Sequence, residues 1–180
     1  SVKPLRELND SERRLFFAEY ERQVLAGAEV DVSIEQALRI WERIQKIPYK
    51  MEVFEDVLPV MQSLKKQGLT LALISNMNRD GNELIESMGL TNYVHFAVTS
   101  NDVGSEKPHA PIFLAALRKA KVDPSKAIHV GDQLTSDVQG ASAVGIAPVL
   151  LDRDINHPSH DSCPRIESLK ELPNLIISLF

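Results

Sequence analysis

The stretch HVGDQLTSDVQGA, residues 129–141, carries two carboxylates between an apolar run and a helical pattern. Gly131 allows the backbone to turn sharply after the apolar run, so Asp132 is expected at the carboxyl edge of a sheet. Asp137 follows five residues later, in the first turn of the next helix. A helix N-terminus favours a carboxylate, and capping alone explains Asp137 but not Asp132. Two carboxylates at a strand end suit Mg²⁺, which prefers oxygen ligands and completes its shell with water and phosphate.

The sequence around this stretch alternates short apolar runs with helical patterns. Strands are predicted at residues 69–75, 93–100, 127–131 and 146–151, and helices at residues 57–64, 81–88, 112–120 and 135–144. This alternation predicts an α/β fold in three layers, with a parallel sheet, right-handed crossovers and helices on both faces. In such a sheet, ligands bind beyond the carboxyl ends of the strands. The residues that follow each apolar run are therefore the candidates for a functional site.

Residues 1–50 have a purely helical pattern. Helices are predicted at residues 11–26 and 34–47, and apolar residues of the second recur at spacings of three and four. Ser33 with Gln36 forms a capping-box pattern before the second helix, and Pro48 stops it. A helical hairpin with one apolar face is too small to fold alone. We therefore predict a small helical unit at residues 1–50 and an α/β core at residues 51–180.

The composition excludes several classes of protein. The chain has 180 residues, a net charge of −5 and a single cysteine, Cys163. One cysteine forms neither an internal disulfide nor a Cys-ligated zinc module, and it favours a reducing compartment. No apolar run approaches the roughly 18 residues of a membrane span, and the first residues lack a signal-peptide pattern. Without a Lys/Arg cluster, nucleic acid is not an expected partner. We expect a soluble, cytoplasmic protein with no membrane partner.

Two further strand ends carry polar residues of interest. Ser75 and Asn76 directly follow the apolar run LTLALI, where a hydroxyl and an amide can hold a phosphoryl oxygen, although Ser-Asn is also a common turn pair. Lys107 directly precedes Pro108, and the residue before a proline is restricted, so its ammonium can be aimed at a ligand. Taken alone, Lys107 is better explained as a solvated loop lysine. Each pair alone favours the structural explanation, but their order along the chain is much more specific.

This order resembles motifs II, III and IV of the haloacid dehalogenase (HAD) superfamily: Ser75-Asn76, then Lys107-Pro108, then Gly131-Asp132 with Asp137, each after an apolar strand. The resemblance covers nearly the whole chain. Residues 1–50 resemble the helical C1-type cap that marks subfamily I. The resemblance implies a three-layer, Rossmann-like HAD core with a parallel sheet, plus a small α-helical cap.

The resemblance also implies roles for individual residues. Ser75 resembles the motif II hydroxyl that binds phosphate, and Asn76 is its frequent neighbour in the phosphate site. Lys107 resembles the motif III lysine, so Ser75 and Lys107 are expected to be catalytic as well as phosphate-binding. Asp132 and Asp137 resemble the motif IV acids that hold Mg²⁺, with Asp132 as the more direct ligand.

Motif I of the superfamily is missing from the 180 residues. There the nucleophile is an Asp in an Asp-x-Asp segment at the end of the first strand; Asp152-Arg153-Asp154 has the spacing but follows the last predicted strand. The chain starts at Ser1, in what resembles the linker into the cap, so we expect that the native N-terminus is lacking. The absent strand would lie between the Ser75 and Asp132 strands, leaving unpaired backbone groups. We expect a fragment that is rearranged, poorly stable or completed by another chain, including self-association through the incomplete sheet.

For the intact protein, the resemblance implies a Mg²⁺-dependent phosphoric monoester hydrolase that acts on a small phosphorylated metabolite through an aspartyl-phosphate. The 180-residue chain alone is expected to be inactive. The alternative is a non-catalytic HAD-like binding or regulatory module. A 2-haloacid dehalogenase is disfavoured, because those enzymes work without metal and typically have a Ser-Ser-Asn-type segment where this chain has Gly131-Asp132-Gln133.

Overall fold

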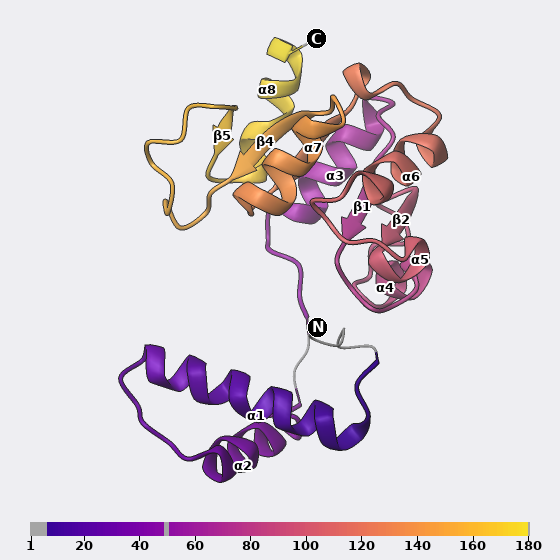
Figure 1. Cartoon of the computed structure of the whole chain (residues 1–180). Coiled ribbons are helices and arrows are strands. Elements are labelled where there is room, and N and C mark those ends of the chain that lie inside the picture. Colours follow the sequence, from indigo (N-terminus) through magenta and orange to yellow (C-terminus); the bar gives the residue numbers. More distant parts are fainter. Residues whose placement is uncertain (1–6, 49–50, 180) are drawn as a thin grey trace. The chain divides into compact units, whose positions relative to one another are not determined.

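The computed structural model describes residues 7–48 and 51–179, and the chain divides into two units, residues 1–51 and 52–180 (Figure 1). The first unit contains helices, and the second alternates helices with parallel strands. Among the described residues, no helix has both the length and the apolar character needed to cross a membrane.

The first unit consists of α1 (Asp10–Gly27) and α2 (Ile34–Ile44), which pack against each other. The rings of Phe17 and Trp41 stack with their centroids 5.1 Å apart and 7° between their planes. The predicted capping box begins α2, with Ser33 Oγ accepting a hydrogen bond from Gln36 N at 3.2 Å. The helix ends three residues before the predicted limit at residue 47, because the backbone there closes into turns such as Ile47 N to Ile44 O at 3.0 Å.

Within residues 52–179, the second unit contains five strands and the helices that connect them. The strands are β1 (Ala72–Ser75), β2 (Phe96–Thr99), β3 (Ile128–Gly131), β4 (Ala147–Leu151) and β5 (Arg165–Ile166). The α-helices are α3 (Val57–Lys66), α4 (Gly81–Ser87), α5 (Ser100–Val103), α6 (Ala110–Ala120), α7 (Gly140–Ala143) and α8 (Leu172–Leu179). The shorter helical turns are η2 (Pro124–Lys126), the π-helical η3 (Leu134–Gln139) and η4 (Leu169–Glu171). The strands are shorter than the apolar runs that predict them, because only the last residues of each run pair with a neighbouring strand.

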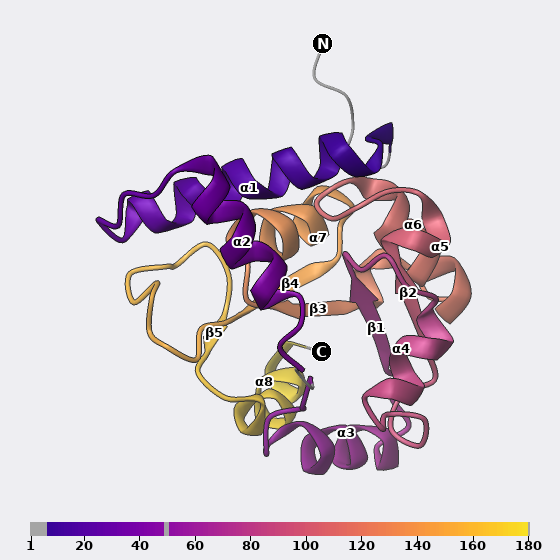
Figure 2. The ribbon, with the colours of Figure 1, turned by 90° about the horizontal axis from the view of Figure 1, so that it is seen from below.

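The strands form two parallel sheets, one of β1 and β2 and one of β3, β4 and β5 (Figure 2). In the first, Ser75 lies opposite Thr99; in the second, Gly131 lies opposite Leu150. Within the described residues, β1 and β3 are not paired with each other. They are also the less buried strands: all four positions of β2 are buried, whereas Ala72 in β1 is exposed and every residue of β3 is half-buried.

Helices cover both faces of these strands. On one face, Phe96 and Val98 of β2 pack with residues of α6 and α7: Ile112, Phe113, Ala116, Leu117 and Ala141. On the other face, Val149 of β4 and Ile166 of β5 pack with residues of α3 and α8: Val60, Leu64 and Leu172. Side chains alternate between the two faces of a strand, so each face can bury its own apolar set. The predicted α/β fold with parallel strands is confirmed.

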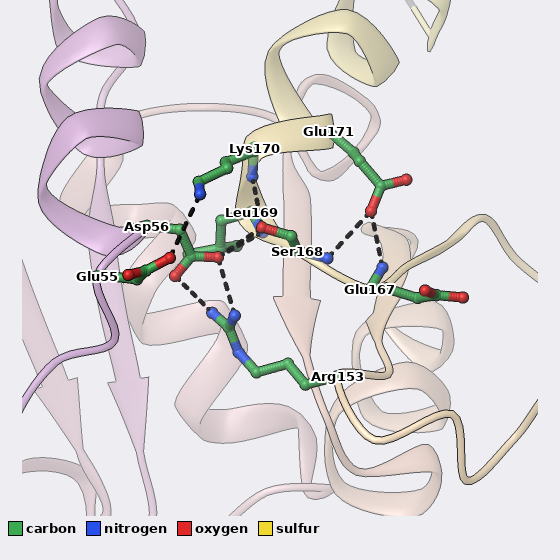
Figure 3. A network of polar contacts seen from close by, with 8 residues as sticks. All are labelled: Glu55, Asp56, Arg153, Glu167, Ser168, Leu169, Lys170 and Glu171. Atoms are coloured by element: carbon green, nitrogen blue, oxygen red, sulfur yellow. Dashed lines mark hydrogen bonds and ion pairs between the residues drawn. The ribbon is translucent and has the colours of Figure 1, made fainter.

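A buried carboxylate ties three segments of the second unit together (Figure 3). Asp56, directly before α3, is 2% exposed and accepts hydrogen bonds from both terminal nitrogens of Arg153, at 2.8 and 2.9 Å. Ser168 Oγ and Leu169 N also donate to it, at 2.8 and 2.9 Å. The hydrogen bonds from Arg153, followed by those from Ser168 and Leu169, lower the pKa of Asp56 to about 2 against the opposing effect of burial. The start of α3, the loop after β4 and the turn before α8 are thus joined through one carboxylate.

Candidate functional site

The candidate site is centred on Lys107, in the turn between α5 and α6. Its Nζ lies 2.6 Å from Oδ1 of Asp137, and the two side chains are 14% and 3% exposed. The partners are 30 residues apart in the chain. The tertiary structure therefore joins the predicted lysine and one of the two predicted acids in a buried ion pair.

Asp137 is positioned by the π-helical turn that follows β3. The backbone N–H groups of Asp137 and Val138 both donate to Gln133 O, at 2.8 and 3.2 Å, which widens the first turn. Gln133 N donates back to Asp137 Oδ2 at 3.0 Å. Gly131 is needed beside this turn, because a Cβ at position 131 would overlap the Asp137 carboxyl group. Single π-helical turns are often found at functional sites.

The Asp137 carboxylate is held in its ionised form. Burial alone would raise its pKa, but hydrogen bonds from His129 and Lys107, the positive charge of Lys107 and the Gln133 N–H together lower the pKa far below its usual range. His129 Nε2 lies 3.0 Å from Oδ1, the same oxygen that accepts the hydrogen bond from Lys107 Nζ. A buried carboxylate with several donors remains charged at neutral pH, so Lys107 has a permanent anionic partner.

The Asn76 side chain contacts the backbone of Lys107. Asn76 Oδ1 accepts a hydrogen bond from Lys107 N at 2.7 Å, and Asn76 Nδ2 donates to Lys107 O at 3.0 Å. The Lys107–Pro108 peptide bond is cis. Both polar atoms of the Asn76 side chain are therefore engaged in holding the turn that carries Lys107. Direct phosphate binding by Asn76 stays a prediction.

Ser75 and Asp132 adjoin residues of this group in the chain. Ser75 is the half-buried last residue of β1, directly before Asn76. Asp132 is the exposed residue that follows β3, between Gly131 and Gln133. Within the described residues, the carboxylate of Asp132 has no hydrogen-bond or ion-pair partner, in contrast to Asp137. Asp132 is thus the acid with free oxygens, and Asp137 is the acid that anchors Lys107.

The fit of Mg²⁺ differs between the two acids. Mg²⁺ binds one or two protein carboxylates and fills the rest of its shell with water and phosphate oxygens. Asp132 offers an accessible carboxylate of this kind. Both oxygens of Asp137 already accept hydrogen bonds, and the described residues contain no cluster of three or more His, Cys, Asp or Glu side chains that could hold a metal. The chain fits a metal held by few protein ligands, with Asp132 better suited to direct contact than Asp137.

His129 is the site residue that the sequence analysis missed. It occupies the second position of β3, and its side chain is 11% exposed. A sequence signal exists, because residues two apart in a strand face the same side, so His129 shares a face with Gly131. Gly131 leaves the space into which Asp137 packs, so a histidine at this spacing before the glycine is placed to reach the carboxylate.

Comparison with known proteins adds a family and relatives to this geometry. The family model described as Haloacid dehalogenase-like hydrolase matches residues 4–151. The chain is 34% identical over 134 residues to Haloacid dehalogenase-like hydrolase domain-containing protein 3 of Mus musculus, covering 73% of this chain and 53% of that protein. It is 30% identical over 146 residues to glyceraldehyde 3-phosphate phosphatase of Methanopyrus kandleri, covering 78% of this chain and 62% of that protein. The chain thus spans little more than half the length of these curated relatives.

Solved structures share the fold. The chain superimposes on a HAD phosphatase from Thermococcus onnurineus with a TM-score of 0.67 and 26% identity, covering 92% of this chain and 78% of that one. It also superimposes on a 2-haloacid dehalogenase from Pseudomonas syringae pv. Tomato DC3000 with a TM-score of 0.64 and 28% identity, covering 95% and 76%. Because both kinds of enzyme have this fold, the reaction must be argued from the site residues.

Proposed function

Because the chain belongs to the haloacid dehalogenase-like hydrolase family, whose model matches residues 4–151, we propose that the full-length protein is a Mg²⁺-dependent phosphatase. It hydrolyses a small phosphomonoester. The observation that carries this proposal is the buried Lys107–Asp137 ion pair, 2.6 Å long, together with the exposed Asp132 that follows β3.

Lys107 is suited to bind a phosphoryl group. An ammonium group has three N–H donors, and Asp137 accepts one of them, which leaves two for phosphoryl oxygens. Asn76 holds the Lys107 backbone and Asp137 holds its ammonium, so little reorganisation is needed when charge develops on the phosphoryl oxygens. The Ser75 hydroxyl, at the end of β1, is proposed as a second donor to the same group. Asn76 acts there chiefly by holding Lys107.

Asp132 is the proposed direct ligand of Mg²⁺. Its carboxylate is exposed at the end of β3, where a metal that keeps several waters can reach it. Asp137 supports the site indirectly, through the hydrogen bonds that its two oxygens accept. When bound, Mg²⁺ supplies positive charge that offsets the charge of the phosphate and the nucleophile.

The proposed reaction has two steps. A carboxylate nucleophile, contributed from outside these 180 residues, forms a bond to phosphorus, and the bond to the substrate oxygen breaks as that oxygen takes a proton from a neighbouring acid. Water then hydrolyses the aspartyl-phosphate and releases inorganic phosphate. Lys107 and Ser75 contact the phosphoryl oxygens in both steps.

The substrate is proposed to be a small phosphorylated metabolite in the cytoplasm. Support comes from the relative in Methanopyrus kandleri, which is a glyceraldehyde 3-phosphate phosphatase, and from the largely buried ammonium of Lys107, a cation suited to a phosphate group. The single cysteine is consistent with a reducing compartment.

The test is an assay of the full-length protein with p-nitrophenyl phosphate. We expect phosphate release that requires Mg²⁺, stops with EDTA and falls by about a hundredfold or more in Asp132→Asn, since removal of a group that stabilises transition-state charge costs roughly this much. Glu55→Gln, an exposed residue paired with Lys170, is the matched control and should keep wild-type activity. Activity that survives both EDTA and Asp132→Asn would overturn the metal assignment.

The alternatives give different results. A 2-haloacid dehalogenase would release halide from 2-chloropropionate without metal. A non-catalytic module would hydrolyse neither compound, and the coding sequence before Ser1 would contain no apolar strand followed by Asp-x-Asp. If the protein is a phosphatase, the coding sequence before Ser1 should contain that segment.

A further inference from the structure

One carboxylate oxygen of Asp137 contacts the side chains of two other residues. Lys107 Nζ lies 2.6 Å from Oδ1, and His129 Nε2 lies 3.0 Å from the same atom. An ionised carboxylate only accepts hydrogen bonds, so the proton of the imidazole is assigned to Nε2. The motifs that predict Lys107 and Asp137 say nothing about His129, yet its side chain is 11% exposed and is directed at the ion pair.

We propose that His129 is a positioning residue for Lys107: its Nε2–H holds Asp137 Oδ1 at the point where that oxygen anchors the Lys107 ammonium. The proposal deepens the proposed phosphatase function and rests on it. His129 does not contact the phosphoryl group. It acts through Asp137.

The flexibility of Asp137 and Lys107 explains why a third side chain, His129, is needed to orient their ion pair. The terminal torsion of an Asp side chain is broad and weakly restricted, and a lysine has a flexible four-carbon stem. Gln133 N fixes Oδ2 from one side at 3.0 Å. His129 fixes Oδ1 from another side, so the carboxylate plane is defined by two donors that belong to the strand and its turn. Lys107 then meets an acceptor that is already oriented.

His129 is itself held in place by packing. Its ring meets the ring of Phe113 edge to face, with centroids 5.2 Å apart and 85° between planes. Phe113 is fully buried in α6 and belongs to the core on that face of the sheet. The position of the imidazole is therefore set by the core, and the hydrogen bond to Asp137 transmits that position to the site.

The test compares two variants of the full-length protein. His129→Leu removes the donor but keeps an apolar side chain against Phe113, and His129→Gln retains an N–H donor near the position of Nε2. With p-nitrophenyl phosphate and saturating Mg²⁺, we expect His129→Leu to lower kcat by about tenfold to a hundredfold, since misplacing a catalytic group by about 1 Å has this effect. KM should change by much less. His129→Gln should recover most of kcat.

The control is His95→Leu. His95 lies before β2, at the opposite end of the strands from Lys107, where its Nδ1 accepts a hydrogen bond from Leu71 N at 3.0 Å. Its loss should leave kcat unchanged. If His129 were only structural, both His129 variants would lower the melting temperature while kcat per folded molecule stayed at the wild-type value, and that result would overturn the proposal.

A second readout does not depend on activity. In ¹⁵N NMR spectra, the wild type should show His129 with its proton on Nε2 and a slowly exchanging Lys107 ammonium signal. His129→Leu should lose the slow Lys107 signal, and His129→Gln should keep it. Retention of that signal in His129→Leu would overturn the positioning role. An inactive wild type with the expected NMR pattern would refute the phosphatase function and leave the positioning of Lys107 standing.

Discussion

The side chain of Asn76 pairs with the peptide groups of Lys107 like a neighbouring strand: Oδ1 accepts from Lys107 N at 2.7 Å, and Nδ2 donates to Lys107 O at 3.0 Å. These bonds join the residue after β1 to a turn 31 residues later. The turn carries the lysine of the candidate site, so the amide has a positional role even without a contact to a ligand.

We expect Asn76→Ala to displace Lys107. Loss of the two hydrogen bonds should lower the free energy of unfolding by about 1–2 kcal/mol and lower kcat for p-nitrophenyl phosphate by about tenfold or more. Steady-state kinetics and urea denaturation measure the two effects. Asn92→Ala, at an exposed position before β2, is the control and should behave as the wild type. An unchanged kcat in Asn76→Ala would refute the positional role.

Gly131→Ala should disrupt the same site from the strand side. The added Cβ would overlap the Asp137 carboxyl group, and overpacking of this kind costs about 1–3 kcal/mol. We expect a lower melting temperature and loss of the slowly exchanging Lys107 ammonium signal. Gly27→Ala provides a matched comparison, because a Cβ there meets nothing within 4 Å, and its stability should not fall. Equal stability of the two variants would mean that Asp137 does not pack against Gly131.

The Asp56–Arg153 ion pair predicts a specific dependence of stability on pH. The pKa of Asp56 is lowered to about 2, whereas an unfolded Asp titrates near about 3.9. Its contribution to stability is therefore complete above the unfolded value and is lost as the pH falls from about 4 to about 2. Asp56→Asn should lower the free energy of unfolding by about 2 kcal/mol at pH 7, and the difference from wild type should narrow as the pH falls from about 4 to about 2.

Urea denaturation at several pH values measures this narrowing. Glu55→Gln is the neighbouring control, because the Glu55–Lys170 pair is exposed and should contribute less than about 1 kcal/mol at any pH. A difference between Asp56→Asn and wild type that stays constant as the pH falls would contradict the prediction.

The unpaired strands predict the behaviour of the 180-residue chain on its own. Within the described residues, β1 pairs only with β2 and β3 only with β4, and both strands are incompletely buried. Open strand edges favour pairing with another chain. We expect low stability or concentration-dependent association, measured by sedimentation velocity and thermal denaturation. A monomer that unfolds in one cooperative transition, with a continuous sheet by hydrogen exchange, would refute this expectation.

Much of the fold could be predicted because its signals are local. Helix α6 begins at Ala110, one residue before Pro111, and α2 begins at the Ser33–Gln36 capping box. These signals depend on residues three or four positions apart in the sequence, so they do not depend on the tertiary structure. Strand limits were less accurate, because pairing with a neighbour, and not hydrophobicity alone, determines which residues join a ladder.

The candidate site likewise has a part that the sequence predicts and a part that only the tertiary structure determines. The residue types at the strand ends identify Ser75, Asn76, Lys107, Asp132 and Asp137 as candidates, because the edge of a parallel sheet is where ligands bind. Their distinct surroundings required the tertiary structure: Asp137 is buried against Lys107, Asp132 is exposed, and Asn76 holds a backbone. His129 joins the site through its contact with Asp137, and Phe113 from a separate helix packs against its ring. Hydrogen bonds between residues 8 to 31 positions apart depend on how strands and helices pack, and local sequence patterns do not specify that packing.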